Sequence, residues 1–355
     1  MTRSSTCTEA FSARVIDWWQ HQGRRDLPWQ GMRDPYRVWL SEIMLQQTQV
    51  ATVQAYYERF LQRFPDVWAL AGASEDDVLG LWSGLGYYSR ARNLHRCARE
   101  VVARHAGCFP STAAELQRLP GIGRSTAAAI AAFCFGQRSA ILDGNVKRVL
   151  ARVFAIDEDL ARSAPQRMLW QRAEDLLPTS QLIERMPAYT QGLMDLGATV
   201  CLPRRPACSR CPLADRCQAF ADGQPERYPV RSPRPARKSL ELWLLQASCS
   251  SGKIWLTQRS ARGIWARLHC LPAFESRAAL FGAVPALLRE TAVEYAPFIH
   301  VLTHRDLHIH RVVVAVPAWT AGGWMQDGAG AWFDAQSWPT LGLPSPVRRI
   351  LAAAD

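Results

Sequence analysis

The chain of 355 residues has 42 lysines and arginines against 31 aspartates and glutamates, a formal net charge of +11. This excess favours a polyanionic partner, nucleic acid before a membrane surface, although a merely basic globular protein also fits it. No run of about 18 apolar residues is present to span a bilayer, and the N-terminus lacks a signal-peptide core. We therefore expect a reduced, cytoplasmic protein, nucleoid-associated if bacterial, whose ten cysteines are metal ligands or buried thiols.

The pattern of apolar residues divides the chain into two expected domains. Helical spacing dominates residues 8–220, which predicts an all-α domain with helices over 50–64, 90–105, 127–135, 166–177 and 188–200. Residues 221–238 include the proline- and arginine-rich run QPERYPVRSPRPARK, typical of a stiff linker. Runs such as LELWLLQAS and HRVVVAVPAW then predict an α+β domain with a sheet over residues 239–355.

Four crowded cysteines close the helical domain with the spacing C-x6-C-x2-C-x5-C: Cys201, Cys208, Cys211 and Cys217. Structural zinc sites usually combine two C-x2-C pairs, whereas four thiolates this close together can hold a [4Fe–4S] cluster. The spacing alone leaves zinc open. Arg204 and Arg205 lie inside the loop, where a metal would present them to phosphates.

A glycine turn, Leu119-Pro120-Gly121-Ile122-Gly123, lies between two expected helices, the first of which follows a capping box at 112–115. Dinucleotide-binding turns and P-loops need a preceding strand, which argues against both interpretations. Gly121 and Gly123 can adopt positive φ, and the N–H groups of the next helix can then meet a phosphate. A plain corner between two helices is the alternative.

Two carboxylates occupy contrasting sequence environments. Glu42 lies in PYRVWLSEIMLQQTQV, a helix apolar on nearly every side, where desolvation would raise its pKa and retain the proton of a general acid. The alternative is a glutamate that faces solvent or pairs with Arg37. Asp143, in SAILDGNVKRVLARVF, is expected to cap the next helix and to stay ionised. One protonated and one ionised carboxyl can cleave a glycosidic bond if the fold brings them together.

These features together resemble the helix-hairpin-helix DNA glycosylases, and within them the adenine DNA glycosylase (MutY-type) family, over essentially the whole chain. The motifs that carry the resemblance are LPWQ (27–30), WLSEIMLQQTQV (39–50), GLGYYSRARNLH (84–95), LPGIGRSTA (119–127), ILDGNVKRV (141–149) and the four cysteines. The resemblance implies a hydrolase acting on N-glycosyl bonds in base excision repair. Its implied partner is duplex DNA with adenine opposite 8-oxoguanine or guanine, and its expected state is a monomer.

The resemblance also implies residue roles. Glu42 would protonate the flipped-out adenine at N7 and later help deliver water, Asp143 would stabilise the positive sugar, and Asn145 would organise the site. The four cysteines would hold one [4Fe–4S] cluster per chain. The implied DNA contacts are Gln47 and Tyr87 where the base leaves the stack, Leu119, Gly121, Gly123 and Ser125 in the hairpin, and Arg204 and Arg205 beside the cluster.

Ser125 decides between two chemistries. In lyase relatives that resemble endonuclease III, a lysine in this place attacks the sugar as an amine. A serine cannot form a Schiff base, so a monofunctional glycosylase that leaves an abasic site is expected. An oxidised-pyrimidine glycosylase with lyase activity and a non-catalytic iron–sulfur DNA-binding protein are the alternatives.

The second domain supports the adenine branch. GIWARLHCLPAF (263–274) resembles the family's Nudix-like domain, which recognises 8-oxoguanine, and residues 274–290 lack the glutamate cluster of a Nudix hydrolase. This domain should therefore bind rather than hydrolyse. Leu302, Thr303 and His304 stand where the family usually has Phe-Ser-His, so a hydroxyl and an imidazole are kept and an aromatic ring is lost. His308 and His310 are expected to be packed or solvated rather than ligands.

Overall fold

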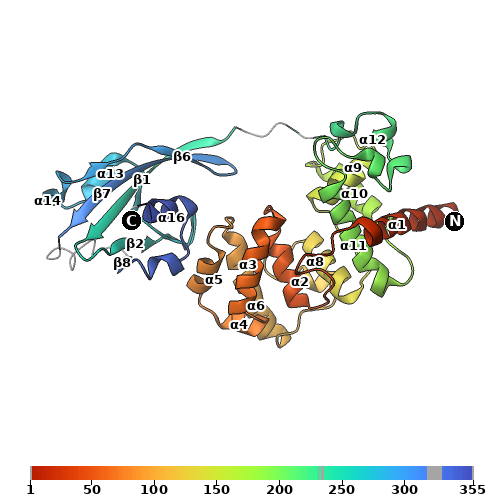
Figure 1. Cartoon of the computed structure of the whole chain (residues 1–355), viewed down its shortest axis with the longest axis horizontal. Coiled ribbons are helices and arrows are strands. Elements are labelled where there is room, and N and C mark those ends of the chain that lie inside the picture. Colours follow the sequence, from red (N-terminus) through yellow and green to blue (C-terminus); the bar gives the residue numbers. More distant parts are fainter. Residues whose placement is uncertain (1, 231, 233–235, 318–329, 354–355) are drawn as a thin grey trace. The chain divides into compact units, whose positions relative to one another are not determined.

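The computed structural model of the chain describes residues 2–230, 232, 236–317 and 330–353 (Figure 1). By internal contacts the chain forms two compact units, residues 1–71 with 96–233 and residues 72–95 with 234–355. The expected boundaries at 221–238 stay a prediction. Residues 72–95 belong to the helical half of the sequence but pack with C-terminal residues, which no local pattern could indicate.

The first unit is helical. It contains α1 (Thr2–Gln22), α2 (Pro35–Met44), α3 (Val50–Arg63), α4 (Val67–Gly72), α7 (Ala113–Leu116), α8 (Arg124–Phe135), α9 (Gly144–Val153), α10 (Ser163–Asp175), α11 (Leu182–Thr199), α12 (Gln218–Ala221) and the 3₁₀ turns η1 (Cys208–Arg210), η2 (Ala214–Arg216) and η3 (Pro225–Arg227). α6 (Ser89–His105) begins in the second unit and ends in the first. All five expected helices are present.

The largest difference from expectation is the start of α11, at Leu182 rather than residue 188. Proline is favoured in the first turn of a helix, where its missing N–H group costs no hydrogen bond, so a helix that starts near Pro187 would be usual. Here it lies inside the helix. The carbonyl of Ile183, which Pro187 cannot reach, accepts a hydrogen bond of 3.2 Å from the guanidinium of Arg33.

α11 is the central helix of the first unit and packs against α1, α8 and α9 (Figure 1). Two glycines allow these close approaches. A Cβ atom at Gly192 would lie 2.8 Å from the Val15 side chain of α1. A Cβ atom at Gly197 would lie 2.6 Å from the Cβ of Asn145, at the start of α9. The position of α9 therefore depends on the absence of a side chain at residue 197.

The glycine turn joins α7 to α8 as expected. Thr112 caps α7 by accepting a hydrogen bond from the N–H of Glu115 (3.3 Å). Gly121 has φ +78, whereas Gly123 has an ordinary φ of −84 and is the N-cap of α8, so the positive φ expected there is wrong. The buried side chains of Leu119 and Ile122 anchor the turn, which leaves the first N–H groups of α8 available for an anion.

The second unit contains a mixed sheet. Its elements are α5 (Glu75–Trp82), β1 (Lys238–Cys249), β2 (Ile254–Gln258), β3 (His269–Cys270), β4 (Ala273–Phe274), α13 (Arg277–Ala283), α14 (Ala286–Arg289), β5 (Val293–Glu294), β6 (Phe298–Val301), β7 (Arg305–Val316), β8 (Gly330–Phe333), η4 (Trp338–Thr340) and α16 (Ser345–Ala352). Within the described ranges the strand order is β3-β2-β1-β7-β5, with β4 on β1, β6 on β7 and β8 on β2. β1 and β7 are parallel over their full length.

Each face of this sheet is covered by helix (Figure 1). On β1, Leu242 and Leu244 pack with α16, whereas Leu245 and Ala247 pack with α13 and α14 on the opposite face. The change of face between residues 244 and 245 follows the two-residue period of a strand. The expected α+β domain with a sheet is confirmed. No helix in the part of the chain that the structure describes is long and apolar enough to cross a membrane.

Candidate active site

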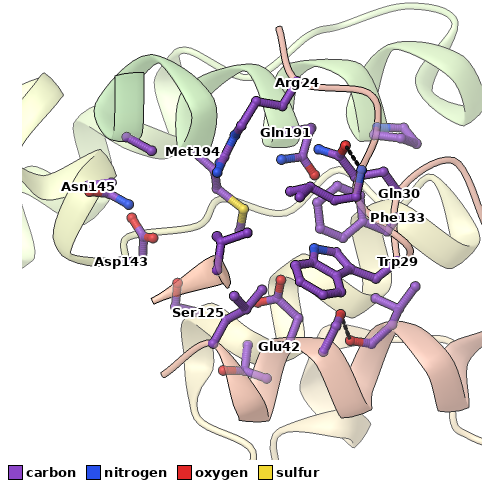
Figure 2. A pocket seen from close by; sticks show the side chains of 18 of the residues that line it. Arg24, Trp29, Gln30, Glu42, Ser125, Phe133, Asp143, Asn145, Gln191 and Met194 are labelled. Carbon is purple, nitrogen blue, oxygen red and sulfur yellow. Dashed lines mark hydrogen bonds between the residues drawn. The ribbon is translucent and has the colours of Figure 1, made fainter. Parts of the chain in front are cut away.

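A pocket of about 940 Å³ in the first unit brings the two predicted carboxylates together. Glu42 enters it from α2, Asp143 and Asn145 from the N-terminus of α9, and Ser125 from the first turn of α8 (Figure 2). The far wall is made by α11 and by residues 24–33. These four residues come from three separate segments, so only the fold places them around one cavity.

Glu42 is held by a buried helix. α2 starts at the Asp34 cap and at Pro35, and it buries Val38, Trp39 and Ile43 around the glutamate. Arg37 pairs with Asp34 (3.5 Å) and not with Glu42, so the alternative of a surface ion pair is wrong.

The Glu42 side chain is half-buried and lines the pocket. The surrounding protein desolvates it, and this burial, with a smaller contribution from the Asp143 charge, raises the pKa of Glu42 to about 8. A carboxyl with this pKa keeps its proton at neutral pH, as a general acid must.

Asp143 caps α9, as expected, and accepts a hydrogen bond of 2.7 Å from the N–H of Val146. Burial raises the pKa of Asp143, although the capping N–H groups and the positive charges of Arg148 and Lys147 act in the opposite direction. The expectation that Asp143 stays ionised at neutral pH stays a prediction. Glu42 and Asp143 influence each other's ionisation, and the better-stabilised negative charge lies at Asp143, at the positive end of a helix.

Two buried arginines connect α9 to the cysteine loop. Arg148 donates to the side-chain oxygen of Asn145 (2.8 Å) and to the carbonyl of Cys201 (2.7 Å). One turn further along, Arg152 donates to Cys201 Sγ (3.2 Å) and to the carbonyl of Leu202 (2.7 Å). A single helix thus carries Asp143 and Asn145 at one end and holds the cysteine loop at the other.

The four cysteines fit an iron–sulfur cluster. Burial, together with smaller contributions from the charges of Cys201, Cys217 and Cys208, raises the pKa of Cys211 to about 12, so the four sulfur atoms gather in one place. Such thiolates need the positive charge of bound iron to stay deprotonated. Among the described residues no three His, Cys, Asp or Glu side chains are close enough to hold a single ion. A cubane cluster joins sulfur atoms that lie further apart than the ligands of one ion.

Ser125 has a structural partner. Its Oγ accepts a hydrogen bond of 3.0 Å from the N–H of Leu142, the residue directly before Asp143. The serine therefore supports the segment that delivers Asp143 to the pocket. At the position where lyases need an amine, this chain has a hydroxyl that already serves the backbone.

The other predicted DNA contacts lie at the surface or around the pocket. Gln47 is exposed at the rim of the pocket with φ +58, and Tyr87, in the second unit, has φ +44 and is 44% exposed. Arg204 and Arg205 are exposed in the cysteine loop, where Glu226 accepts a hydrogen bond from the backbone N–H of Arg205 (2.8 Å). Non-glycine residues with positive φ are uncommon and concentrate at functional sites.

The residues predicted to read the lesion, Leu302, Thr303 and His304, form the turn between β6 and β7. The N–H of Leu302 donates to the carbonyl of Arg305 (2.8 Å), and the Leu302 side chain packs on the core under α16. Thr303 and His304 are exposed. Leu302 thus anchors the loop, and the two polar side chains are presented outward.

Two amide side chains of the pocket, Gln191 and Gln30, were not among the predicted site residues. Gln191 donates its amide to Asp195 (3.0 Å), a fully buried carboxylate that also binds the Arg24 guanidinium (2.9 Å from Nε). Gln30 accepts a hydrogen bond from the N–H of Leu27 (3.4 Å), and its buried Nε2 makes no hydrogen bond within the described residues. Both amides lie beside Trp29 in Figure 2. The LPWQ motif was an available signal, but its use as a pocket wall was not predictable.

Comparison with known proteins agrees with this geometry. Residues 40–178 match the HhH-GPD superfamily of base excision DNA repair proteins, residues 201–217 the iron–sulfur binding domain of endonuclease III, and residues 243–353 the NUDIX domain. The adenine DNA glycosylase of Buchnera aphidicola subsp. Acyrthosiphon pisum is 34% identical over 343 residues, 96% of each chain. That of Homo sapiens is 47% identical over 219 residues, 59% of this chain and 39% of the human protein.

A solved structure, a thermostable thymine-DNA glycosylase, matches with a TM-score of 0.55 at 27% identity and covers 61% of this chain and 98% of its own. The helical fold and its hairpin define a DNA glycosylase of the helix-hairpin-helix class. The chain belongs to the adenine DNA glycosylase family, hydrolases of N-glycosyl bonds in base excision repair. Its endonuclease III-type loop implies a [4Fe–4S] cluster, for which Cys201, Cys208, Cys211 and Cys217 are the available ligands.

Replacing Glu42 by Gln should abolish base removal, because the amide has no acidic proton. In the parent protein the single-turnover rate should fall as the pH rises through about 8, where Glu42 loses its proton. The raised pKa also means that folding keeps Glu42 protonated between its unfolded and folded pKa, so rising pH in this interval destabilises the parent. E42Q should therefore raise the Tm at pH 8 more than at pH 5. An active E42Q protein would contradict the assignment.

Replacing Ser125 by Ala removes the acceptor for the Leu142 N–H and should loosen Asp143. We expect the single-turnover rate to fall by about tenfold, since a lost buried hydrogen bond costs about 1 kcal/mol or somewhat more. Ser139→Ala is the matched control, because Ser139 bonds the Ala128 carbonyl (3.3 Å) and does not line the pocket. Equal rates for both variants would show that the Ser125 contact does not position Asp143.

Proposed function

We propose that the chain is a monofunctional glycosylase that removes adenine mispaired with 8-oxoguanine or guanine and leaves an abasic site. The observation that carries this proposal is the pocket where Glu42, with a pKa of about 8, lies near Asp143 at a helix N-terminus, with no lysine among its lining residues. A base inside a duplex cannot reach this pocket, so the adenine must be flipped out. The expectations of a monomer and of a cytoplasmic location stay predictions.

The proposed reaction uses the two carboxyl groups in sequence. Glu42 donates its proton to adenine N7, and the C1′–N9 bond breaks with its electron pair moving to the base. Asp143 stabilises the positive charge on the sugar in this proposal, which its position at the N-terminus of α9 and the contact of Asn145 with Arg148 support. The Glu42 carboxylate then takes the proton of the water that adds to C1′, which restores the starting state.

The pocket amides support adenine as the base. Because Asp195 can only accept, Gln191 must direct its amide nitrogen to Asp195, and its oxygen is left as an acceptor. Gln30 presents the opposite group, a buried N–H donor. Adenine offers an amino donor at N6 and an acceptor at N1, which complements this pair. At the same two positions guanine has an acceptor where adenine has the amino donor, and a donor where adenine has the N1 acceptor. Guanine would therefore leave buried groups of the pocket unpaired.

The remaining features support binding to DNA. The N–H groups that open α8 and the exposed Arg204 and Arg205 suit phosphate contacts, and the net charge of +11 suits the duplex as a whole. In the second unit, Thr303 and His304 are the polar groups proposed to read the base opposite adenine. A lyase mechanism would need an amine nucleophile in the pocket, and the position that would hold it is occupied by Ser125.

The proposed function is tested with a duplex containing one adenine opposite 8-oxoguanine, end-labelled on the adenine strand. We expect strand cleavage only after alkali, because hydrolysis leaves an intact abasic strand. Cleavage before alkali would indicate a hidden amine and a lyase. Tight binding without cleavage, both before and after alkali treatment, would make the protein a lesion binder without activity.

The role of Gln191 is tested by pairing a protein variant with a base analogue. Gln191→Leu removes the acceptor, and purine in place of adenine removes the amino donor. We expect Q191L to slow release of adenine about tenfold, as for one lost buried hydrogen bond, and to change release of purine little. Equal losses on both bases would show that Gln191 acts on folding or on Asp195 and does not contact N6.

A further inference from the structure

A buried ion pair lies behind one wall of the pocket. Asp195 of α11 is fully buried, and its carboxylate accepts hydrogen bonds from the backbone N–H of Arg24 (3.0 Å) and from Nε and Nη2 of the Arg24 guanidinium (2.9 and 2.5 Å). The same carboxylate accepts the amide of Gln191 (3.0 Å). Because the backbone and two guanidinium nitrogens of Arg24 bind one buried group, the orientation of this side chain is fixed.

Arg24 itself lines the pocket. Its side chain is 29% exposed, and in Figure 2 the guanidinium points into the pocket, between the side chains of Gln191 and Asn145. Nε and Nη2 are bound to Asp195, whereas Nη1 makes no hydrogen bond within the part of the chain that the structure describes. The ion pair therefore presents one guanidinium nitrogen, in a fixed orientation, to the molecule that occupies the pocket.

The polar atoms of adenine leave one position for this donor. In the proposed function Glu42 serves N7, Gln191 serves the N6 amino group and Gln30 serves N1. The remaining acceptor is N3, which lies on the sugar side of the base. Asp143 marks the sugar side of the pocket, and in Figure 2 the Arg24 guanidinium points between that side and the amides.

We propose that Arg24 donates a hydrogen bond to N3 of the departing adenine and that Asp195 is the positioning residue for this donor. The inference rests on the proposed function. When the C1′–N9 bond breaks, its electron pair enters the ring system that includes N3, so N3 becomes a better acceptor as the reaction proceeds. No proton leaves Arg24, since Glu42 supplies the proton on N7 and the base departs as neutral adenine. A donor to an atom that gains negative charge stabilises the transition state more than the bound substrate.

The Asp195 charge explains how a cation can serve in this pocket. Before the bond breaks, the base carries the proton from Glu42, and as the bond breaks, the sugar becomes positive. An isolated guanidinium would repel positive charge at both stages. Paired with Asp195, Arg24 keeps the strength of a charged donor and adds no net charge to the pocket.

The test combines protein variants with base analogues placed opposite 8-oxoguanine. 3-Deazaadenine has C–H in place of N3, and 1-deazaadenine has C–H in place of N1. Single-turnover rates give the ratio of adenine to each analogue for every protein. The intrinsic lability of each base is the same in all proteins, so it cancels when the ratios of a variant and the parent are compared.

The main variant combines Arg24→Leu with Asp195→Asn. It removes both charges together and leaves an acceptor for Gln191, so no buried charge is left unpaired. We expect R24L/D195N to lower the ratio of adenine to 3-deazaadenine at least about tenfold, as for one charge-assisted hydrogen bond. The ratio of adenine to 1-deazaadenine should stay as in the parent.

A second variant, Arg24→Lys, keeps the charge and a contact with Asp195, so folding should be retained. An ammonium bound to Asp195 lacks the fixed second nitrogen of a guanidinium, so R24K should also lower the ratio of adenine to 3-deazaadenine. The matched control combines Glu9→Gln with Arg185→Leu, which removes another ion pair between α1 and α11 whose members do not line the pocket. It should lower the Tm and leave both ratios unchanged.

The outcomes separate the inference from the proposed function. A ratio of adenine to 3-deazaadenine that is the same in R24L/D195N, R24K and the parent would overturn the inference and leave the proposed function intact. Equal losses on all three bases would do the same, because they would show that the ion pair only supports the fold. A parent protein that removes no adenine would overturn the proposed function and the inference with it.

Discussion

The pocket depends on the placement of one helix, α9. Its first residues supply the Asp143 cap and Asn145, and its buried arginines bind the loop of the cysteines. A buried guanidinium is costly unless its donors are used, and here carbonyl oxygens, an amide oxygen and a thiol accept them. The hydrogen bonds that offset the cost of burying these arginines also fix the position of α9 along its length. The cysteine loop therefore contributes to the geometry of Asp143 without touching the pocket.

Burial explains why two carboxyl groups of one pocket can differ in function. Desolvation raises the pKa of both, but the N–H groups that open α9 favour negative charge only at Asp143. Glu42 lies in the last turn of α2, the end of a helix that offers no free N–H groups. Moving the proton from Glu42 to Asp143 would leave the less stabilised group charged, so the fold biases the pair toward one arrangement. The catalytic asymmetry arises from where each residue lies on its helix.

Local patterns predicted the elements and several of the contacts. The helical domain, the α+β domain, the Asp143 cap and the desolvation of Glu42 could be read from spacing and residue type. The raised pKa of Asp143 could not, because it comes from burial by the folded chain, and no local pattern distinguished the ordinary φ of Gly123 from the positive φ of Gly121. The early start of α11 could not be predicted either. There Arg33 supplies the hydrogen bond to the Ile183 carbonyl that Pro187, which has no N–H group, cannot make. Placement of residues 72–95 with the C-terminal residues required tertiary contacts that no local pattern contains.

Gln47 and Tyr87 show how backbone conformation can point to function. Each has positive φ without being glycine or asparagine, a conformation that costs about 1 kcal/mol or more. Both side chains are exposed, so burial of the side chain does not compensate for that cost. Surrounding structure holds each backbone in place, through the turn after α2 in one case and the glycine-rich hairpin in the other. The proposed contact of both residues with DNA would account for this cost, because a DNA stack opened by base flipping would bury the two exposed side chains.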